Sequence, residues 1–163
     1  MTHVAYDPRF PVNAEDRSQV IDTVNRLNLA FDVWDIKTML AVFTEDGVVD
    51  HARGEIKGHE ALRHFYDAYR PLTLGVRRQA VNHVVDGLPD GTIRVHSYNM
   101  LVRVAPAADH EQVKLEIVSE YDNYPAMYIQ AVMTDIFRKD PGFGWRICHR
   151  SAGQNSVNRS MRA

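Results

Sequence analysis

Two residues of this sequence, Asp32 and His83, have types and surroundings that suit proton transfer. Asp32 lies one step off an apolar stripe whose steps of four and three residues are typical of one buried helix face: Val20, Val24, Leu27, Phe31 and Trp34. A carboxylate at the margin of such a stripe points partly inward, where an ionised group is costly unless something pairs with it. We expect His83 to be that partner.

His83 is flanked at two-residue spacing by Val81 and Val85, which predicts that it lies on an apolar strand face. Desolvation there lowers a histidine pKa and a nearby carboxylate raises it, so the balance leaves a base near neutral pH. Asp32 would orient the ring and stabilise the imidazolium formed after proton abstraction. The alternative is that Asp32 makes a local cap or ion pair and His83 is an ordinary core histidine.

Seven further residues are candidates for the substrate site. Those expected to line the core or a pocket are Phe31, Trp34, Phe65, Tyr69 and Met133. His51 is a candidate pocket acid, and Tyr98, on the same strand face as His96 and Met100, is a candidate hydrogen-bond donor. For each of them ordinary packing or a solvated surface position is the alternative.

No metal or cofactor site is expected from the sequence. Asp50, His51, His59 and His64 lack the i, i+4 pairing or the cysteines of a metal centre. No glycine-rich phosphate loop is present, and Cys148 is alone, which excludes an intrachain disulfide.

Composition indicates one domain, residues 1–163, with an N-terminal arm at 1–13 and a flexible tail at 152–163. The 19 basic and 21 acidic residues form no long block of either sign, so we expect neither a nucleic acid nor a membrane as partner. No apolar stretch approaches the ~20 residues that span a bilayer. A cytoplasmic protein is expected.

The order of the elements predicts helices first and strands afterwards. A long helix should begin at Asn13 and end near Trp34, and Asp35 should cap a second one, which Glu45–Gly47 ends. The remaining predicted elements are a strand pair at 48–52 and 54–58, a helix at 59–70, and strands at 77–86, 92–105, 113–121, 128–137 and 145–152. This order is typical of an α+β fold in which helices cover one face of a curved antiparallel sheet.

Long strands such as 128–137 alternate little between apolar and polar residues. The convex face of the sheet should therefore be too apolar for water, and a homo-oligomer is expected.

Three helices, a hairpin and a long run of strands, with FDxxD near the end of the first helix and an NHV strand about fifty residues later, resemble a known family. It is the SnoaL-like branch of the nuclear-transport-factor-two-like superfamily, and the chain is most similar to the scytalone dehydratase and hexachlorocyclohexane dehydrochlorinase group. The resemblance, over roughly residues 18–151, implies a cystatin-like α+β barrel: a cone-shaped antiparallel sheet around three helices, with an internal apolar pocket.

Carried over by position, the family's orienting aspartate falls on Asp32 and its general-base histidine on His83. Phe31 and His51 stand where scytalone dehydratase has pocket tyrosines. Its pocket histidine aligns with Val102, and its serine and asparagine align near Ala131 and Met133. These departures argue against scytalone dehydratase itself.

The expected function is a cofactor-independent lyase or isomerase acting on a small apolar ring compound, with His83 as base and Asp32 as its orienting acid. If an oxygen leaves, Tyr98 or His51 is the candidate acid. Two alternatives remain: a non-catalytic module resembling the small subunit of aromatic-ring dioxygenases, and a polyketide cyclase or hydroxylase. The resemblance implies trimers for the dehydratase group and dimers for the wider superfamily.

Overall fold

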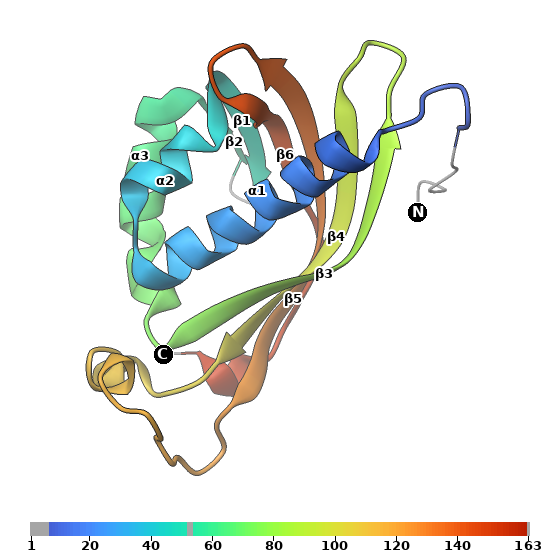
Figure 1. Cartoon of the computed structure of the whole chain (residues 1–163). Helices are drawn as coiled ribbons and strands as arrows, with labels where there is room; N and C mark the ends of the chain where they lie inside the picture. The colour runs from blue at the N-terminus through green and yellow to red at the C-terminus, as the bar shows by residue number, and fades with distance from the viewer. Residues whose placement is uncertain (1–6, 52–53, 163) are drawn as a thin grey trace.

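The computed structural model describes residues 7–51 and 54–162. Three α-helices precede most of the strands in this part of the chain (Figure 1). The helices are α1 (Ala14–Val33), α2 (Ile36–Ala41) and α3 (Gly58–Tyr69). The strands are β1 (Phe43–His51), β2 (Gly54–Lys57), β3 (Val76–Gly87), β4 (Ile93–Arg103), β5 (Ala126–Asp140) and β6 (Gly144–Val157). The α+β class expected from the sequence is confirmed.

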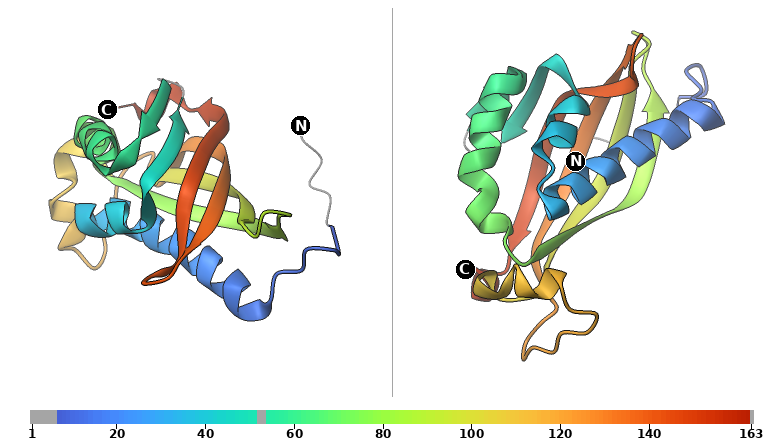
Figure 2. Two further views of the ribbon diagram at one scale, coloured as in Figure 1. Left: turned by 90° about the horizontal axis from the view of Figure 1, so that it is seen from above. Right: turned by 60° about the vertical axis from the view of Figure 1, so that its left-hand side comes forward.

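The described strands form one curled sheet in the order β2-β1-β6-β5-β4-β3. β1 pairs with β6 in parallel, whereas the other neighbours are antiparallel, so the sheet is mixed rather than purely antiparallel. The parallel pair arises because the chain leaves the sheet through α3 after β2 and adds β3 at the far edge. β2 and β3 do not pair with each other, so the cone is open. Figure 2 shows the helices on the concave side.

α1 packs mainly on β3 and starts where the sequence predicts. The Asn13 side chain accepts a hydrogen bond from the Asp16 backbone N–H at 2.8 Å, and Trp34 ends the helix in the left-handed conformation. Its buried face carries Val20, Val24 and Leu27. α1 thus spans the interior from the β3–β4 hairpin to the start of β3 (Figure 1).

The interior face of the sheet is built from rows of residues in register. One row crosses every strand: Val85, Val95, Asp135, Arg150, Val49 and Ile56. Four of its six members are apolar, as a core requires. Asp135 and Arg150 are the two charged members of this row, and both are buried.

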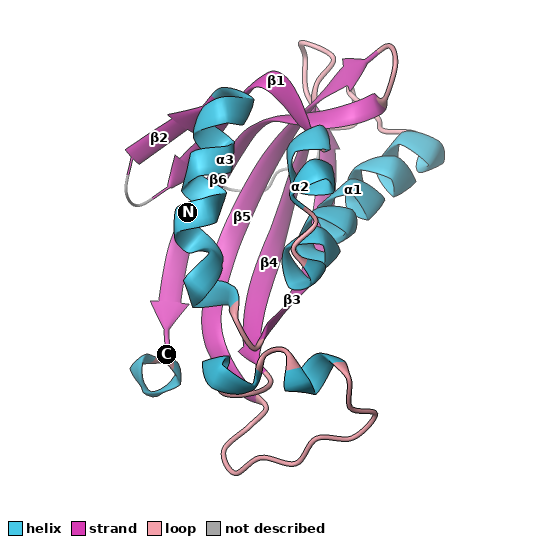
Figure 3. Cartoon of the chain, turned by 90° about the vertical axis from the view of Figure 1, so that its left-hand side faces the viewer, coloured by secondary structure: helices cyan, strands magenta, loops and turns pink. Residues whose placement is uncertain are grey.

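Two local expectations are wrong. Residues 45–47 lie within β1, although they were expected to end a helix. Residues 113–121 form no strand: they belong to the long connection between β4 and β5 at the lower end of the sheet (Figure 3) and pair with none of the described strands. Part of the segment 152–163, expected as a tail, carries regular structure, because β6 continues to Val157 and a 3-10 helix, η4 (Arg159–Met161), follows. Its flexibility stays a prediction.

Candidate functional site

Asp32, in the last turn of α1, is held by Arg78 of β3. Its carboxylate accepts hydrogen bonds from the Arg78 backbone N–H, at 3.1 Å to each oxygen, and from Arg78 Nη1 at 3.3 Å. Both side chains are buried, with 9% of Asp32 and 3% of Arg78 exposed. Burial raises the pKa of Asp32, while the hydrogen bonds and charge of Arg78 oppose that rise.

The expected contact between Asp32 and His83 is not formed. In the described part of the chain, Nε2 of His83 is buried and has no hydrogen-bond partner. Desolvation lowers the pKa of His83; the nearby charge of Asp135 raises it, and that of Arg17 lowers it further. Asp32 is not among the charges that act on this histidine, so the two predicted catalytic residues occupy separate places.

The separation follows from the way α1 runs along β3. Asn28, one turn before Asp32, donates a hydrogen bond to Asn99 Oδ1 at 3.3 Å, and Asn99 lies opposite Ala80. The helix therefore runs antiparallel to the strand, and its last turn meets the start of β3. His83 is five residues beyond Arg78, roughly 15 Å along a strand.

A β-bulge also changes the face on which neighbours of His83 lie. Asn82 has φ 56°, and the β3–β4 register shifts between Val81 and Val84. Val81 pairs with the exposed Tyr98, whereas Val85 pairs with the buried Val95. The expectation that Val81, His83 and Val85 share one face is therefore wrong.

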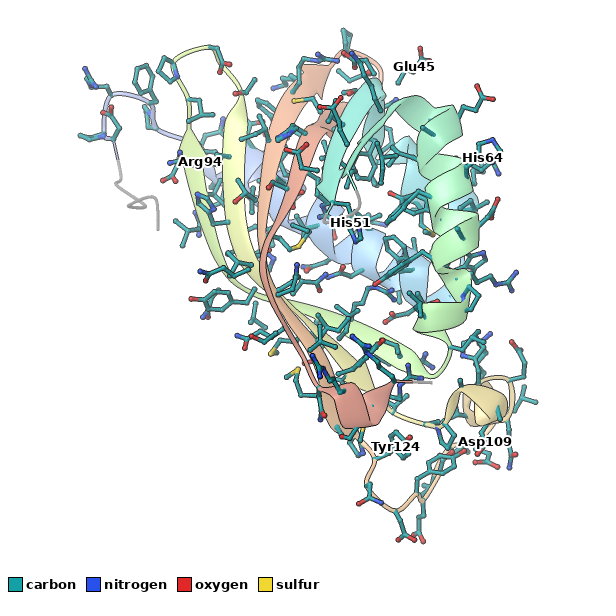
Figure 4. All side chains as sticks on the ribbon, turned by 180° about the vertical axis from the view of Figure 1, so that it is seen from behind. Glu45, His51, His64, Arg94, Asp109 and Tyr124 are labelled. Carbon is teal, nitrogen blue, oxygen red and sulfur yellow. The ribbon has the colours of Figure 1, made fainter. Side chains whose placement is uncertain are left out.

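Five of the predicted substrate-site residues come together in one aromatic cluster: Phe31, Trp34, His51, Phe65 and Tyr69, joined by Tyr66. Ring centroids are 5.1 Å apart for Phe31 and Tyr66, 5.6 Å for Phe65 and Tyr69, and 5.0 Å for His51 and Phe65. The Arg78 guanidinium lies over the Phe31 ring at 4.5 Å. Figure 4 shows His51 between the strands and α3, and His64 on the outer side of α3.

The other two predicted residues do not join this cluster. Tyr98 is 41% exposed and pairs with Val81 and Val132 on the outer face, so it is not an interior hydrogen-bond donor. His96, on the same face, exchanges a hydrogen bond with Thr134 through Nδ1 at 2.9 Å. Met133 is buried on the inner face opposite Ser97.

A second buried charge centre was missed in the sequence. Arg150 donates to Asp135 through Nε at 2.6 Å and Nη2 at 2.8 Å, and both side chains are almost fully buried. Burial raises the pKa of Tyr66, and the charges of Arg150 and Asp135 also act on this phenol. The sequence does contain a signal for it. Asp135 has the apolar residues Met133 and Phe137 at two-residue spacing, so the three share one strand face, and that face is expected to be buried.

Two hollows of the structure lie away from these residues. A hollow of about 360 Å³ is lined by the N-terminal arm and the β3–β4 hairpin, including Phe10 and Arg94. A neighbouring one of about 230 Å³ includes Phe10 and Trp145. Neither hollow is lined by Asp32 or His83.

Within residues 7–51 and 54–162, no group of three or more His, Cys, Asp or Glu side chains is arranged to hold a metal ion. Over the same described ranges, no helix has the length and apolar character needed to cross a membrane.

The fold and interior define a class of small α+β proteins with a cone-like sheet. A family model described as SnoaL-like domain matches residues 12–151, and the chain belongs to the SnoaL-like family. This family includes polyketide cyclases and related enzymes. A search of the curated proteins found no match.

Several solved structures share the fold. A protein of unknown function with a cystatin-like fold from Nostoc punctiforme is 24% identical, with a TM-score of 0.68 and coverage of 91% of this chain and 96% of that one. An NTF2-like protein from Novosphingobium aromaticivorans is 19% identical, with a TM-score of 0.67 and coverage of 89% and 83%. ActVI-ORFA from Streptomyces coelicolor is 16% identical, with a TM-score of 0.67 and coverage of 83% and 95%.

Proposed function

We propose that the protein is a cofactor-independent lyase or isomerase that moves a proton on a small, largely apolar ring compound, with Asp32 as the acid–base group. The observation that carries this proposal is the Asp32–Arg78 pair, buried at the edge of the aromatic cluster. Aromatic side chains there favour a flat apolar ligand. A buried carboxylate whose pKa is raised is a better base than one in water.

Each member of the pair has a distinct role in the proposed step. Asp32 accepts a proton from a carbon next to a carbonyl group, and the electron pair of that C–H bond moves onto the carbonyl oxygen. Arg78 is permanently charged, and its Nη2 is buried without a partner among the described residues. It donates to the developing oxyanion. Return of the proton elsewhere completes an isomerisation, and departure of a leaving group completes an elimination.

This proposal changes the sequence-based mechanism in one respect: Arg78, not His83, is the partner of Asp32. The polyketide-cyclase alternative remains compatible, because ring closure between carbonyl compounds also begins with removal of a proton from carbon. His83 has no role in the proposed step.

A second candidate is a non-catalytic ligand-binding module, the role expected for a protein that resembles a dioxygenase small subunit. The observation that favours it is the set of hydrogen bonds between Asp32 and Arg78. A carboxylate so occupied also serves to fasten α1 to β3. Binding without turnover distinguishes this role from the enzymatic one.

The test is a screen of hydroxylated, halogenated and carbonyl-bearing ring compounds against the purified protein, with binding and turnover measured separately. For a substrate so found, Asp32→Asn should lower turnover on the order of 10²-fold or more while the ligand still binds. Asp22→Asn is the matched control, because Asp22 is on the same helix and 56% exposed. Full activity of folded Asp32→Asn would overturn the proposal, and ligands that bind without any turnover would favour the module.

A further inference from the structure

Arg103, at the end of β4, is a buried cation without an anionic partner in the described chain. Only 1% of the residue is exposed. Its Nη1 donates to the Leu74 carbonyl oxygen at 2.7 Å, and its guanidinium lies over the Tyr128 ring at 4.8 Å. Nε and Nη2 are both buried and, among the residues described, have no hydrogen-bond partner.

Burying such an arginine lowers the stability of the folded protein. A buried ionised group requires pairing, and arginine does not avoid the cost by losing its proton, because its pKa is too high. One carbonyl and one aromatic ring leave most of its five N–H donors unused. The free Nε and Nη2 lie on one edge of the guanidinium, which is the edge that binds a carboxylate through two parallel hydrogen bonds.

Two carboxylates of the protein near this end already have charged partners. Asp32 is bound to Arg78, and Glu111 lies beside Lys114 and His110, at 3.0 and 3.6 Å. No ion pair joins Arg103 to any Asp or Glu in residues 7–51 and 54–162. This end of the cone therefore keeps an excess of buried positive charge.

Arg103 faces the same interior as Arg78. Val76 pairs with Arg103 and Arg78 pairs with Leu101, so the two arginines are diagonal neighbours across β3 and β4. Diagonal neighbours on one face have Cβ atoms about 7–8 Å apart, within reach of long side chains. A ring compound bound with its reacting carbonyl at Arg78 would thus have its other side near Arg103.

The cover over Arg103 consists of connections rather than of long helices. Leu74 follows the 3-10 helix η1 (Arg70–Thr73), and Met161 of η4 packs against the cluster that contains Tyr128. Val104 donates to the Gly75 carbonyl oxygen at 2.8 Å, which joins the start of the β4–β5 connection to the start of β3. Figure 3 shows this connection at the lower end of the sheet. Such segments open at lower cost than core elements do.

We propose that Arg103 binds a carboxylate group of the ligand, so that the substrate class is an aromatic or cyclic carboxylic acid. The proposal deepens the proposed function and rests on it for the position of the ring. Arg78 then donates hydrogen bonds to the reacting oxygen, and Arg103 donates hydrogen bonds to a carboxylate that takes no part in the reaction. The carboxylate both neutralises the buried guanidinium and fixes the orientation of the ring relative to Asp32.

The test compares two probes of the same shape, 1-naphthoate and 1-naphthamide, by titration calorimetry with the wild-type protein. The charged probe should bind at least roughly tenfold more tightly, because its hydrogen bonds to a guanidinium are charge-assisted. The Arg103 Nε–H resonance in a proton–nitrogen correlation spectrum should also shift with naphthoate and not with naphthamide. Equal affinities, or an Arg103 resonance that naphthoate leaves unchanged, would overturn the proposal.

Variants assign the preference to this residue. Arg103→Met, which keeps much of the aliphatic volume, should abolish the preference for naphthoate. Arg77→Met is the matched control and should retain the preference. Arg77 directly precedes Arg78 but lies on the opposite face of β3, where it pairs with Val102. If Arg103→Met does not fold, Arg103→Lys keeps a charge without the planar fork and should retain only part of the preference. A full preference in any folded Arg103 variant contradicts the proposal.

Binding alone is measured here, so the two proposals fail separately. Loss of the naphthoate preference leaves the acid–base role of Asp32 standing. Full turnover by Asp32→Asn would remove that role without changing the affinity of Arg103 for a carboxylate.

Discussion

The Asp32 carboxylate accepts hydrogen bonds from both the backbone and the side chain of Arg78, which fastens the last turn of α1 to the start of β3. The backbone N–H is available because β3 is an edge strand, with only β4 beside it in the described sheet. A carboxylate that satisfies an edge N–H and pairs with a guanidinium is a structural link, and in the proposed step it is also the reactive group. Experiments on this residue must therefore measure stability and turnover separately.

Double-mutant cycles should show that Asp32 is coupled to Arg78 and not to His83. Combining Asp32→Asn with Arg78→Gln should give a coupling free energy of about 0.5–3 kcal/mol, because the side chains are in contact. Combining Asp32→Asn with His83→Gln should give additive changes, within roughly 0.5 kcal/mol. Urea denaturation provides both values. Strong coupling between Asp32 and His83 would show that the pair meets in solution.

His83 should make the protein less stable in mild acid. Because burial lowers its folded-state pKa below the ordinary 6.5, the unfolded chain binds a proton that the folded chain does not. Stability is then fully present above pH 6.5 and falls as the pH decreases toward the depressed pKa. Thermal melts between pH 8 and 5 should show a shallower decline for His83→Gln than for wild type.

The control for this pH effect is His64→Gln, because His64 is exposed on α3. The melting temperature of His64→Gln should change with pH as that of wild type does. Burial also lowers the pKa values of His96 and His110, so these residues contribute to the pH dependence of both proteins. A curve for His83→Gln that coincides with wild type would contradict the prediction.

Breaking the buried Asp135–Arg150 pair should cost much more than breaking an exposed one. Asp135→Asn leaves the Arg150 guanidinium buried without a charge partner, and the expected loss is about 3–5 kcal/mol of unfolding free energy. Replacing both residues, as Asp135→Leu with Arg150→Met, should recover most of that loss. In the exposed Arg138–Asp46 pair, Asp46→Asn should cost less than about 1 kcal/mol. Similar losses at both pairs would be inconsistent with this account.

The homo-oligomer expected from the sequence stays a prediction, and the structure identifies the face on which to test it. The outer face of β3–β5 carries Val84, Tyr98 and Met127, each between 41% and 42% exposed. Val84→Lys should shift sedimentation at micromolar concentration toward the monomer. Val33→Lys, at an exposed valine on α1, should not. A wild-type protein that sediments as a monomer would contradict the expectation.

Periodicity and capping residues predicted most of the framework. Asn13 and Asp35 cap α1 and α2 as expected, because short polar side chains before an apolar stripe satisfy free N–H groups. β3 was predicted from its alternation, and β4, β5 and β6 from apolar runs bounded by turn residues, whereas the strand expected at 113–121 is not formed. The helical stripes predicted that Phe31 and Phe65 line the interior, but not that they join His51 of β1 in one aromatic cluster.

The predicted contact between Asp32 and His83 is not formed because it depended on the register of β3 and β4, and the pattern of residue types does not determine that register. Alternation along β4 gives two sets of residues, and it does not say whether Tyr98 or Ser97 faces inward. The bulge at Asn82 inserts one residue and exchanges the faces of β3. Asparagine tolerates the left-handed conformation, but many asparagines never adopt it. Predicting the contact between Asp32 and Arg78 would have required knowing the direction in which α1 runs along the sheet.

The position of β6 has a consequence for synthesis of the chain. β6 lies between β1 and β5, so the β1–β2 hairpin joins the rest of the described sheet only through the last of its strands in sequence. While the ribosome is still producing residues 144–157, Phe43 and Val49 have no β6 to pair with. Folding of the complete sheet therefore follows release of most of the chain. Until then the nascent protein exposes two open strand edges, where chaperones would bind and where aggregation would begin.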